Sequence, residues 1–574
     1  MKIYNWRPFL DRWSADWIDS PGAEGREDAA EEIVRDRWLG FAPAGAERIA
    51  ALEERLDAEL PPSYRSFLAV TDGWRPAGTA VELLGTVDGV HWHKGAELQE
   101  LYESALDEES SDDEVVRAGM RGRALQLSVA SDATDLLLDP GDVNADGEWA
   151  AYLHRAWSGE LPVRYESFLD LMQALFRDFH RSNAGPEFVN ATTRELDASV
   201  EEARVACLAG EDIDEQLDVF EDAAEHGRPR AGGFRDELTA LLNGRPGDTG
   251  GRLLPYEPVG PFRTAVDTAR EQARWGDTDA AWRTLATAVG TWEAYGNEHV
   301  APVGLLADPI LGPVITPERG RYLLETPRGG GRGGRHEGGA WDAAGLVSRE
   351  IGLTWLADHV EQPGDYRFVL VRDVSPEEVA ARVGEGPLLP PSDEGDIRRR
   401  SFGPDGRPVV RVGSAGEGWS FAYGTVLEPF GSGQLNDPGE RASRGTEAVT
   451  IWVERGDTSA GRPGVFYFSC AEDGERGYGF TVRGDEIEEW GDVPEALDPE
   501  ELFPGAEVPE DSVESEESEE SYEDEGPAPV ALDVDDEYEA LDAVTGIFGV
   551  ALPQLALRRG RLHTVATGPW IAAR

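Results

Sequence analysis

The chain has 574 residues, with 53 Lys+Arg against 112 Asp+Glu, so its formal net charge at pH 7 is −59. A surface this negative repels phosphate backbones and anionic lipid headgroups, which argues against direct binding to nucleic acids or membranes. It suits a basic protein partner, although solubility or a salty cytoplasm explains the same charge without any partner. Hydrophobic residues make up 40% of the chain, which supplies packed cores and excludes wholesale disorder.

The cysteines and the N-terminus indicate the compartment. Cys207 and Cys470 are the two cysteines, and two cannot build a disulfide framework or a thiolate zinc cluster. This usage fits a reducing cytoplasm. The segment Met1–Pro8 lacks the apolar core of a signal peptide, and no run approaches about 18 consecutive apolar residues. We therefore expect a soluble, cytoplasmic protein.

Residues 1–185 predict a first domain. Apolar residues at helical spacing predict a helix from Ile49 to Leu60, which Pro61-Pro62 ends. A second short helix carries Tyr64, Phe67 and Leu68 on one face, before a turn at Asp72-Gly73. Later segments predict four strands and a closing helix. These are Val81–Leu84, Ala124–Val129, Asp135–Pro140, Trp149–Leu153 and the helix Tyr165–Phe176. Helices, then strands, then a helix are typical of an α+β domain with an antiparallel sheet.

Residues 186–325 predict a helical middle region. Its expected helices are Phe188–Ala209, Ile213–Ala224, Phe234–Leu242 and Ala265–Tyr295, with Gly-Asp breaks such as Gly276-Asp277. These helices do not recur at a fixed sequence spacing. We therefore expect a helical linker domain and not a solenoid.

A Gly/Arg-rich stretch, residues 326–345, predicts a flexible joint before a C-terminal α+β domain at 346–574. Ser375 as N-cap, Pro376 at the first helical position and Glu378 predict a capped helix. The segments with strand patterns are Tyr366–Val371, Trp419–Tyr423, Val449–Val453, Gly464–Ser469 and Tyr478–Val482. Residues 509–526 are acidic and serine-rich, and we expect them to stay solvated. A last helix, Tyr538–Phe548, and a strand, Leu562–Val565, should dock back on this domain.

Two motifs resemble a metal site and a cofactor site, but the residues around each of them argue against binding. Asp142, Asn144, Asp146 and Gly147 fit the first half of a calcium loop, but the twelfth position, where a bidentate Glu belongs, is Leu153. Asp146-Gly147 more simply predicts a hairpin turn. The other motif is G-x-G-x-x-G, formed by Gly329, Gly331 and Gly334. It lacks the strand-turn-helix setting that a dinucleotide site needs, so a flexible linker is the better interpretation.

The histidines give no catalytic set. His91 and His93 lie on one side of a predicted strand and could chelate a metal, but no third ligand has recognisable spacing. A satisfied or surface pair is the better interpretation. No Ser/His/Asp or Cys/His arrangement is detectable in the sequence, although such sets are spatial. We expect no catalytic residue, no metal and no cofactor.

Tryptophans crowd the first domain. They are Trp6, Trp13, Trp17, Trp38, Trp74, Trp92, Trp149 and Trp157. Most should be core residues, because an indole buries a large apolar area, whereas an exposed one would anchor an interface. Trp74, which follows the Asp72-Gly73 turn, is the best single candidate for an anchor.

One run of residues resembles a known family. The pattern is a helix, Leu-Pro, a Tyr and a Phe-Leu on a second helix, then Asn-Gly. Here it consists of Gly45–Glu53, Leu60-Pro61, Tyr64, Phe67-Leu68 and Asp72-Gly73-Trp74. This is similar to the signature of the SUKH superfamily of Smi/Knr-like domains, which includes a fungal cell-wall-synthesis regulator and many bacterial proteins. Asp72 replaces the usual Asn, a mild departure because both residues tolerate turn geometry. The stretches 136–140, 147–149 and 165–168 are also similar, so the resemblance covers roughly residues 30 to 180.

The resemblance implies an α+β fold with a twisted sheet and no catalytic residues. Bacterial relatives commonly act as immunity proteins that neutralise toxins, often nucleases, and a basic toxin would meet a complementary field here. We expect partner contacts at Asp72, Gly73, Trp74, Glu148 and Trp149. The C-terminal part is similar to a domain of unknown function common in high-GC actinobacteria. The alternatives are a regulatory or scaffold protein and, third, an enzyme with its site in the C-terminal domain.

Overall fold

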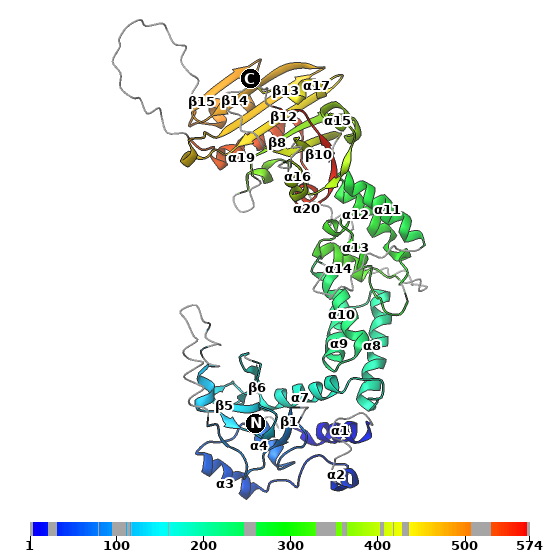
Figure 1. The fold of residues 1–574 in the computed structure, drawn as a ribbon, viewed down its shortest axis with the longest axis vertical. Coiled ribbons are helices and arrows are strands. Elements are labelled where there is room, and N and C mark those ends of the chain that lie inside the picture. The colour runs from blue at the N-terminus through cyan, green and yellow to red at the C-terminus, as the bar shows by residue number, and fades with distance from the viewer. Residues whose placement is uncertain are drawn as a thin grey trace, which may run out of the picture. The chain divides into compact units, whose positions relative to one another are not determined.

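The computed structural model describes most of the chain and divides it into two units. The described residues are 4–20, 31–77, 80–94, 111, 115, 118–155, 157–158, 160–245, 260–294, 296–328, 352–358, 364–401, 407–416, 418–426, 435–506 and 530–570. Unit 1 comprises Met1–Ala206 and Asp212–Arg235, and unit 2 comprises Cys207–Glu211 and Asp236–Arg574. Figure 1 labels many of their helices and strands. Helices and antiparallel sheets occur together, which confirms the predicted α+β multidomain class.

Unit 1 combines helices with two small sheets. Its elements are α1 (Trp6–Asp19), α2 (Glu31–Asp36), α3 (Ala46–Leu56), α4 (Pro62–Leu68), β1 (Val81–Leu84), β2 (His91–Trp92), η1 (Met120–Gly122), β3 (Leu125–Gln126), β4 (Ser128–Ser131), β5 (Thr134–Val143), β6 (Trp149–Arg155), β7 (Val163–Tyr165), α7 (Phe168–Ser182), most of α8 (Ala191–Ala209), α9 (Ile213–Glu225) and the start of α10 (Pro229–Leu242). Strands β1 and β4 form a two-stranded sheet. The other sheet has the order β2-β3-β5-β6-β7, and every pair in it is antiparallel.

The helix pair α3 and α4 is broken as the prolines predict. Helix α3 ends earlier than expected, because Asp57 is left-handed at φ 53° and caps it. Pro62 then occupies the first turn of α4, where its missing N–H costs no hydrogen bond. Ile49 and Leu52 from α3 and Tyr64 from α4 enter one core. The predicted two-helix entry into the sheet is confirmed.

Two predicted strands have different bounds. The segment 124–129 forms two strands, β3 and β4, separated at Leu127. Strand β5 continues through Pro140 to Val143, where the register with β6 shifts between Asp139 and Val143. Proline lacks a donor, so it fits a sheet at such an irregularity.

Unit 2 combines helices with a nine-stranded antiparallel sheet. Its helices are the rest of α10, α11 (Pro261–Arg274), α12 (Thr278–Ala288), η2 (Val289–Thr291), α13 (Gly304–Ala307), η3 (Gly312–Val314), α14 (Pro317–Glu325), η5 (Thr354–Ala357), α15 (Pro376–Val383), α16 (Glu394–Ser401), α17 (Pro438–Ala442), η6 (Thr458–Ala460), η7 (Glu495–Leu497), α18 (Pro499–Leu502), α19 (Val534–Phe548) and α20 (Gln554–Arg559). Its strands are β8 (Tyr366–Arg372), β9 (Leu389–Ser392), β10 (Val409–Gly416), β11 (Trp419–Thr425), β12 (Glu447–Glu454), β13 (Val465–Glu472), β14 (Glu475–Arg483), β15 (Glu486–Trp490) and β16 (Leu562–Ala566). The order is β15-β14-β13-β12-β8-β11-β10-β16-β9.

The central strands of the nine-stranded sheet are buried on both faces. On β8, Phe368 and Leu370 belong to the core that includes α19, whereas Val369 and Val371 belong to a second core that includes α15. This explains why the strand is apolar without alternation. As predicted, Ser375 caps α15 by accepting from the backbone N–H of Glu378. Strand β16 enters the sheet between β10 and β9, so the predicted return of the C-terminal strand is confirmed.

Several predicted features fall outside the described residues. Gly329, Gly331 and Gly334 do, as does the acidic tract 509–526. No helix among the described residues is long and apolar enough to cross a membrane.

Candidate functional site

Asp72 and Gly73, two of the predicted partner-contact residues, follow α4 and connect the helix pair to the region of strand β1. The carboxylate of Asp72 accepts from Arg48 Nη1 at 2.6 Å and from the backbone N–H of Val87 at 2.7 Å. Gly73 has φ 107°, and a Cβ there would lie 2.8 Å from the carbonyl oxygen of Leu84. Asp72 and Gly73 therefore hold a close backbone approach that a side chain would obstruct.

Trp74 is a core residue, which corrects the expectation that it is exposed. Its side chain is 0% exposed. The ring centroid lies 5.7 Å from that of Trp13 and 5.3 Å from that of Trp38. The turn therefore aims the indole inward. In this conformation Trp74 can affect a partner only by supporting the fold around it.

Glu148 and Trp149 are buried as well. The Glu148 carboxylate accepts from the backbone N–H of Ser63 at 2.9 Å and from its Oγ at 2.5 Å. These contacts lie in the first turn of α4, where a negative charge complements the helix dipole. Trp149 stacks on Trp92, with centroids 6.5 Å apart. A direct role of these residues in partner binding stays a prediction, and their observed contacts position α4 and the sheet.

The five-stranded sheet has an inner and an outer face. Alternate residues such as Leu136, Leu138 and Leu153 enter the main core of unit 1. Their neighbours on β5 and β6 face the other side, where Leu137 and Tyr152 join a small apolar cluster with Met120, Ala124 and Ala150. This outer face therefore has its own thin apolar layer, and polar side chains lie along the same strands.

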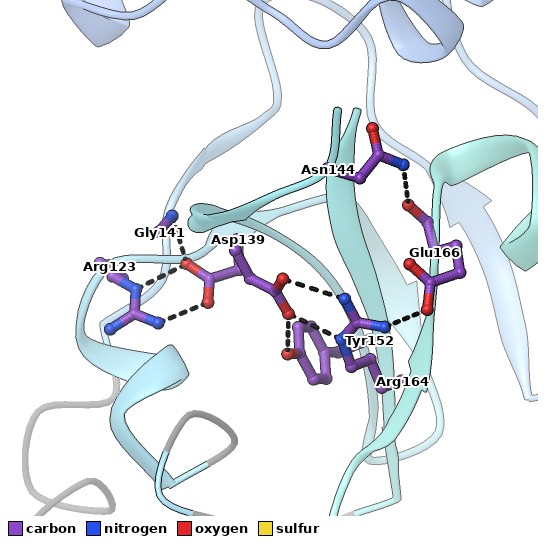
Figure 2. Close-up of polar contacts among 8 residues, drawn as sticks. Arg123, Asp139, Gly141, Asn144, Tyr152, Arg164 and Glu166 are labelled. Atoms are coloured by element: carbon purple, nitrogen blue, oxygen red, sulfur yellow. Dashed lines mark hydrogen bonds and ion pairs between the residues drawn. The ribbon is translucent and has the colours of Figure 1, made fainter. Parts of the chain in front are cut away.

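The outer face carries two forked ion pairs (Figure 2). Arg123 donates to both carboxylate oxygens of Asp139, at 2.7 Å each. Arg164 donates to both oxygens of Asp142, at 2.7 and 2.9 Å, and Tyr152 donates to the same carboxylate at 2.9 Å. Hydrogen bonding with Arg164 lowers the pKa of Asp142 and raises the pKa of Arg164. Bidentate pairs fix geometry, so this face is preorganised.

Arg164 also links the face to the end of β7. Its Nη1 donates to Glu166 at 2.5 Å, and the Asn144 side chain donates to the Glu166 carbonyl at 3.4 Å. Asn144 itself accepts from the backbone N–H groups of Asp146 and Glu148, and Gly147 has φ 81°. These bonds make the hairpin turn that the Asp146-Gly147 pair predicts, and the carboxylate of Asp142 is already paired with Arg164.

Two histidines lie beside one carboxylate elsewhere on the outer face. His93 Nε2 and His154 Nδ1 are 3.7 and 3.6 Å from Asp135 Oδ2. Hydrogen bonding with His154 and His93 holds the pKa of Asp135 well below its usual range. His91, the predicted companion of His93, is exposed on β2. Within the described ranges, no group of three or more His, Cys, Asp or Glu side chains could hold a metal ion.

Among the polar side chains inside unit 2, Asp437 connects α17 to β12 and β13. Asp437 accepts from Thr450 Oγ1, Ser469 Oγ and the Tyr467 hydroxyl, at 2.6, 2.6 and 3.0 Å, and caps α17. Burial raises the pKa of Cys207 to about 12 and that of Cys470 to about 11, so both thiols stay protonated and unreactive at neutral pH.

The sequence did not single out the exposed tryptophan of this domain. Trp157 lies between β6 and β7 and is 70% exposed, with Leu161 and Val163 exposed beside it in sequence. One sequence signal could have found it: Ser158-Gly159, a turn composition, follows Trp157 directly. This places Trp157 in a turn, outside the alternating pattern of the two flanking strands.

The comparisons with known proteins bear on this region. Residues 43–174 match the SMI1/KNR4 family (SUKH-1). The match contains the α3–α4 pair, both sheets and the start of α7. No curated protein and no solved structure matches the chain.

Proposed function

We propose, from the premise that residues 43–174 form a SUKH-1 domain of the SMI1/KNR4 family, that this chain is a non-enzymatic protein that binds and neutralises a basic toxin. The domain by itself is consistent with an immunity-type or a regulatory protein. The immunity role is the more specific choice, and a nuclease is the kind of toxin it fits, because nucleases present cationic surfaces to their substrates.

The charge of the domain supports a basic partner. Residues 43–174 contain 26 Asp+Glu and 10 Lys+Arg, so 10 − 26 gives −16. Nine of these carboxylates fall within residues 97–114, which hold no Lys or Arg. A field of this sign accelerates encounter with a cationic protein and weakens as salt screens it. The observation that carries the proposal is this acidity within the matched domain.

The outer sheet face supports binding in another way. The ion pairs of Asp139 and Asp142 lock side chains that would otherwise lose rotamer entropy on binding. An already ordered surface keeps more of its contact energy as affinity. The same pairs neutralise Asp139 and Asp142, so these two carboxylates add little attraction for a cationic partner.

The test is capture of a partner by the full chain from its native cytoplasm at low and at raised salt. We expect a basic protein that is released by salt and whose toxic activity the chain suppresses. A variant with the nine acids of residues 97–114 changed to amides should associate several-fold more slowly. If no salt-sensitive partner is captured, or if the captured protein keeps its activity in the complex, the proposal is wrong.

A further inference from the structure

Three exposed apolar residues occur in the turn between β6 and β7 and at the start of β7, the last strand of the five-stranded sheet. Trp157, Leu161 and Val163 are 70%, 39% and 44% exposed and fall within seven residues. We call this the Trp157 edge: these three side chains together with the outer edge of β7. Exposed apolar side chains this close in sequence, on a turn and the edge strand that follows it, are candidates for an interaction site.

The turn between β6 and β7 presents the indole. The backbone N–H of Ser158 donates to the carbonyl of Arg155 at 3.1 Å, and Glu160 N donates to Ser158 Oγ at 3.2 Å. Among the sixteen tryptophans that the structure describes, Trp157 alone is exposed, whereas the others are buried or half-buried. An exposed indole on a hydrogen-bonded turn has the features of an interface anchor.

Strand β7 is the last strand of its sheet. Its three residues pair with β6 on one side, as Ala151↔Tyr165, Tyr152↔Arg164 and Leu153↔Val163. Within the described residues, no strand pairs with its other side. The backbone groups on that side are therefore a template for another extended chain.

The outer strands of unit 2 show how such an edge is protected. Strand β9 carries Pro390 and Pro391, and strand β15 carries Glu486, Glu488 and Glu489. Proline and charge both discourage pairing at a sheet edge. At β7 the outermost strand instead begins with the exposed Val163, next to an exposed indole.

Charge decides which occupant fits the Trp157 edge. A second copy would bring another domain of net charge −16, so self-pairing is opposed. Arg164 is neutralised by Asp142 and Glu166, and Glu160 and Glu166 are exposed at the two ends of the edge. We infer that the Trp157 edge binds an extended cationic segment of the partner, which adds as a strand beside β7 and packs an apolar side chain on Trp157. This rests on the proposed function.

The short strand determines where the affinity must come from. Three residues offer only a few backbone hydrogen bonds to an added strand. The indole contact must therefore supply much of the binding, with Leu161 and Val163 excluding water around it. Removing the indole should cost more than any other single change at this edge.

The test uses the full chain and a synthetic peptide of about ten residues with alternating Lys and Val, which has the chemistry of a cationic strand. We expect slower hydrogen exchange in residues 157–166 when the peptide binds, and no effect of a matched Glu–Val peptide. Trp157→Ala should weaken binding about tenfold, equivalent to ~1.4 kcal/mol. Val163→Lys should weaken it too, because it adds charge to the edge. Tyr538→Ala, which removes an exposed aromatic ring from α19, is the matched control and should change nothing.

Three results would overturn the inference. The peptide could slow hydrogen exchange only outside residues 157–166, or nowhere. Trp157→Ala could bind the peptide with unchanged affinity, or sedimentation could reveal a dimer of the wild-type chain that is absent in Trp157→Ala. Binding of the native partner distinguishes a failure of this inference from a failure of the proposed function. If the captured basic protein binds the wild-type chain and Trp157→Ala equally well, the function stands and the Trp157 edge is not its site.

Discussion

The two large sheets differ in what covers them. The nine-stranded sheet of unit 2 is buried on both faces at its centre, where strand β8 carries apolar residues at successive positions. The five-stranded sheet of unit 1 buries one face in the main core and places the ion pairs of Asp139 and Asp142 on the other. A sheet whose faces are both covered can offer a partner only its outermost strands. A sheet with one polar face and an unprotected edge strand offers two surfaces, the face and the edge. This difference is the reason for proposing recognition in unit 1.

The largest expected effect tests the burial of both faces in unit 2. Phe368 and Val369 point to opposite sides of β8, and each is 0% exposed. We expect Phe368→Ala to cost about 3–5 kcal/mol of unfolding free energy and Val369→Ala about 2 kcal/mol. Urea denaturation monitored on unit 2 measures both. Glu166→Ala, at an exposed position of unit 1, should stay within about 0.5 kcal/mol. If either core substitution is as mild as this control, one face of β8 is open.

A comparable effect is expected at Trp74 in unit 1. Replacing this fully buried indole with alanine removes contacts to Trp13 and Trp38 and should cost about 3–5 kcal/mol. Thermal unfolding of the full chain gives the measurement, and Trp74→Phe, which retains a ring, should cost less. A Trp74→Ala protein that keeps its stability but loses its partner would make Trp74 a contact residue and reverse the assignment made here.

The ion pairs of the outer face should contribute less. Arg164 is 24% exposed and Asp142 18%, so their pair is partly screened by water. We expect Arg164→Met to cost about 1–2 kcal/mol, because the half-buried Asp142 carboxylate loses the two hydrogen bonds that Arg164 donates to it. A double-mutant cycle with Asp142→Asn isolates the coupling. Coupling near zero would show that the face is not held by this pair.

The same pair predicts a pH dependence. The folded pKa of Asp142 lies below its unfolded value, so its contribution is fully present above pH ~4 and is lost as the pH falls through the folded pKa. We expect the Tm of unit 1 to fall with acidification below pH ~4, and to fall less steeply in Asp142→Asn. Equal slopes for the two proteins would contradict a depressed pKa at this residue.

The smallest effect on stability is expected at the Trp157 edge. Because Trp157 is largely exposed, Trp157→Ala should change the unfolding free energy by no more than about 0.5 kcal/mol. Thermal unfolding beside Trp74→Ala makes the contrast direct: one tryptophan supports the fold, and the other contacts solvent. A strongly destabilised Trp157→Ala would mean that the indole packs inside unit 1.

Local patterns predicted the elements whose signals lie within a few residues. The Pro61-Pro62 break, the Ser375 cap and the hairpin turn at Asp146-Gly147 each depend on neighbours in sequence, and all three are confirmed. The apolar spacing predicts that α3 continues to Leu60, but the helix ends at Leu56 because Asp57 adopts the left-handed conformation.

Features set by distant residues could not be predicted in the same way. Strand β5 passes through Pro140 because its pairing with β6 tolerates an irregularity there. The polar network joins Arg123 to Asp139 and Arg164 to Asp142 only after the sheet has formed. Composition predicted that most tryptophans are core residues, but it could not say that Trp74 is buried and Trp157 exposed, because that depends on which side of the sheet each turn faces.

The most direct measurement is the rate at which the full chain associates with the basic protein it captures, determined over a range of salt concentrations. We predict a rapid association that slows steeply as salt rises, and a shallower dependence for the chain in which residues 97–114 carry amides in place of the nine acids. An association rate that is indifferent to salt, or identical in the two proteins, would contradict the proposal that the acidic region matching the SUKH-1 family recognises a cationic partner.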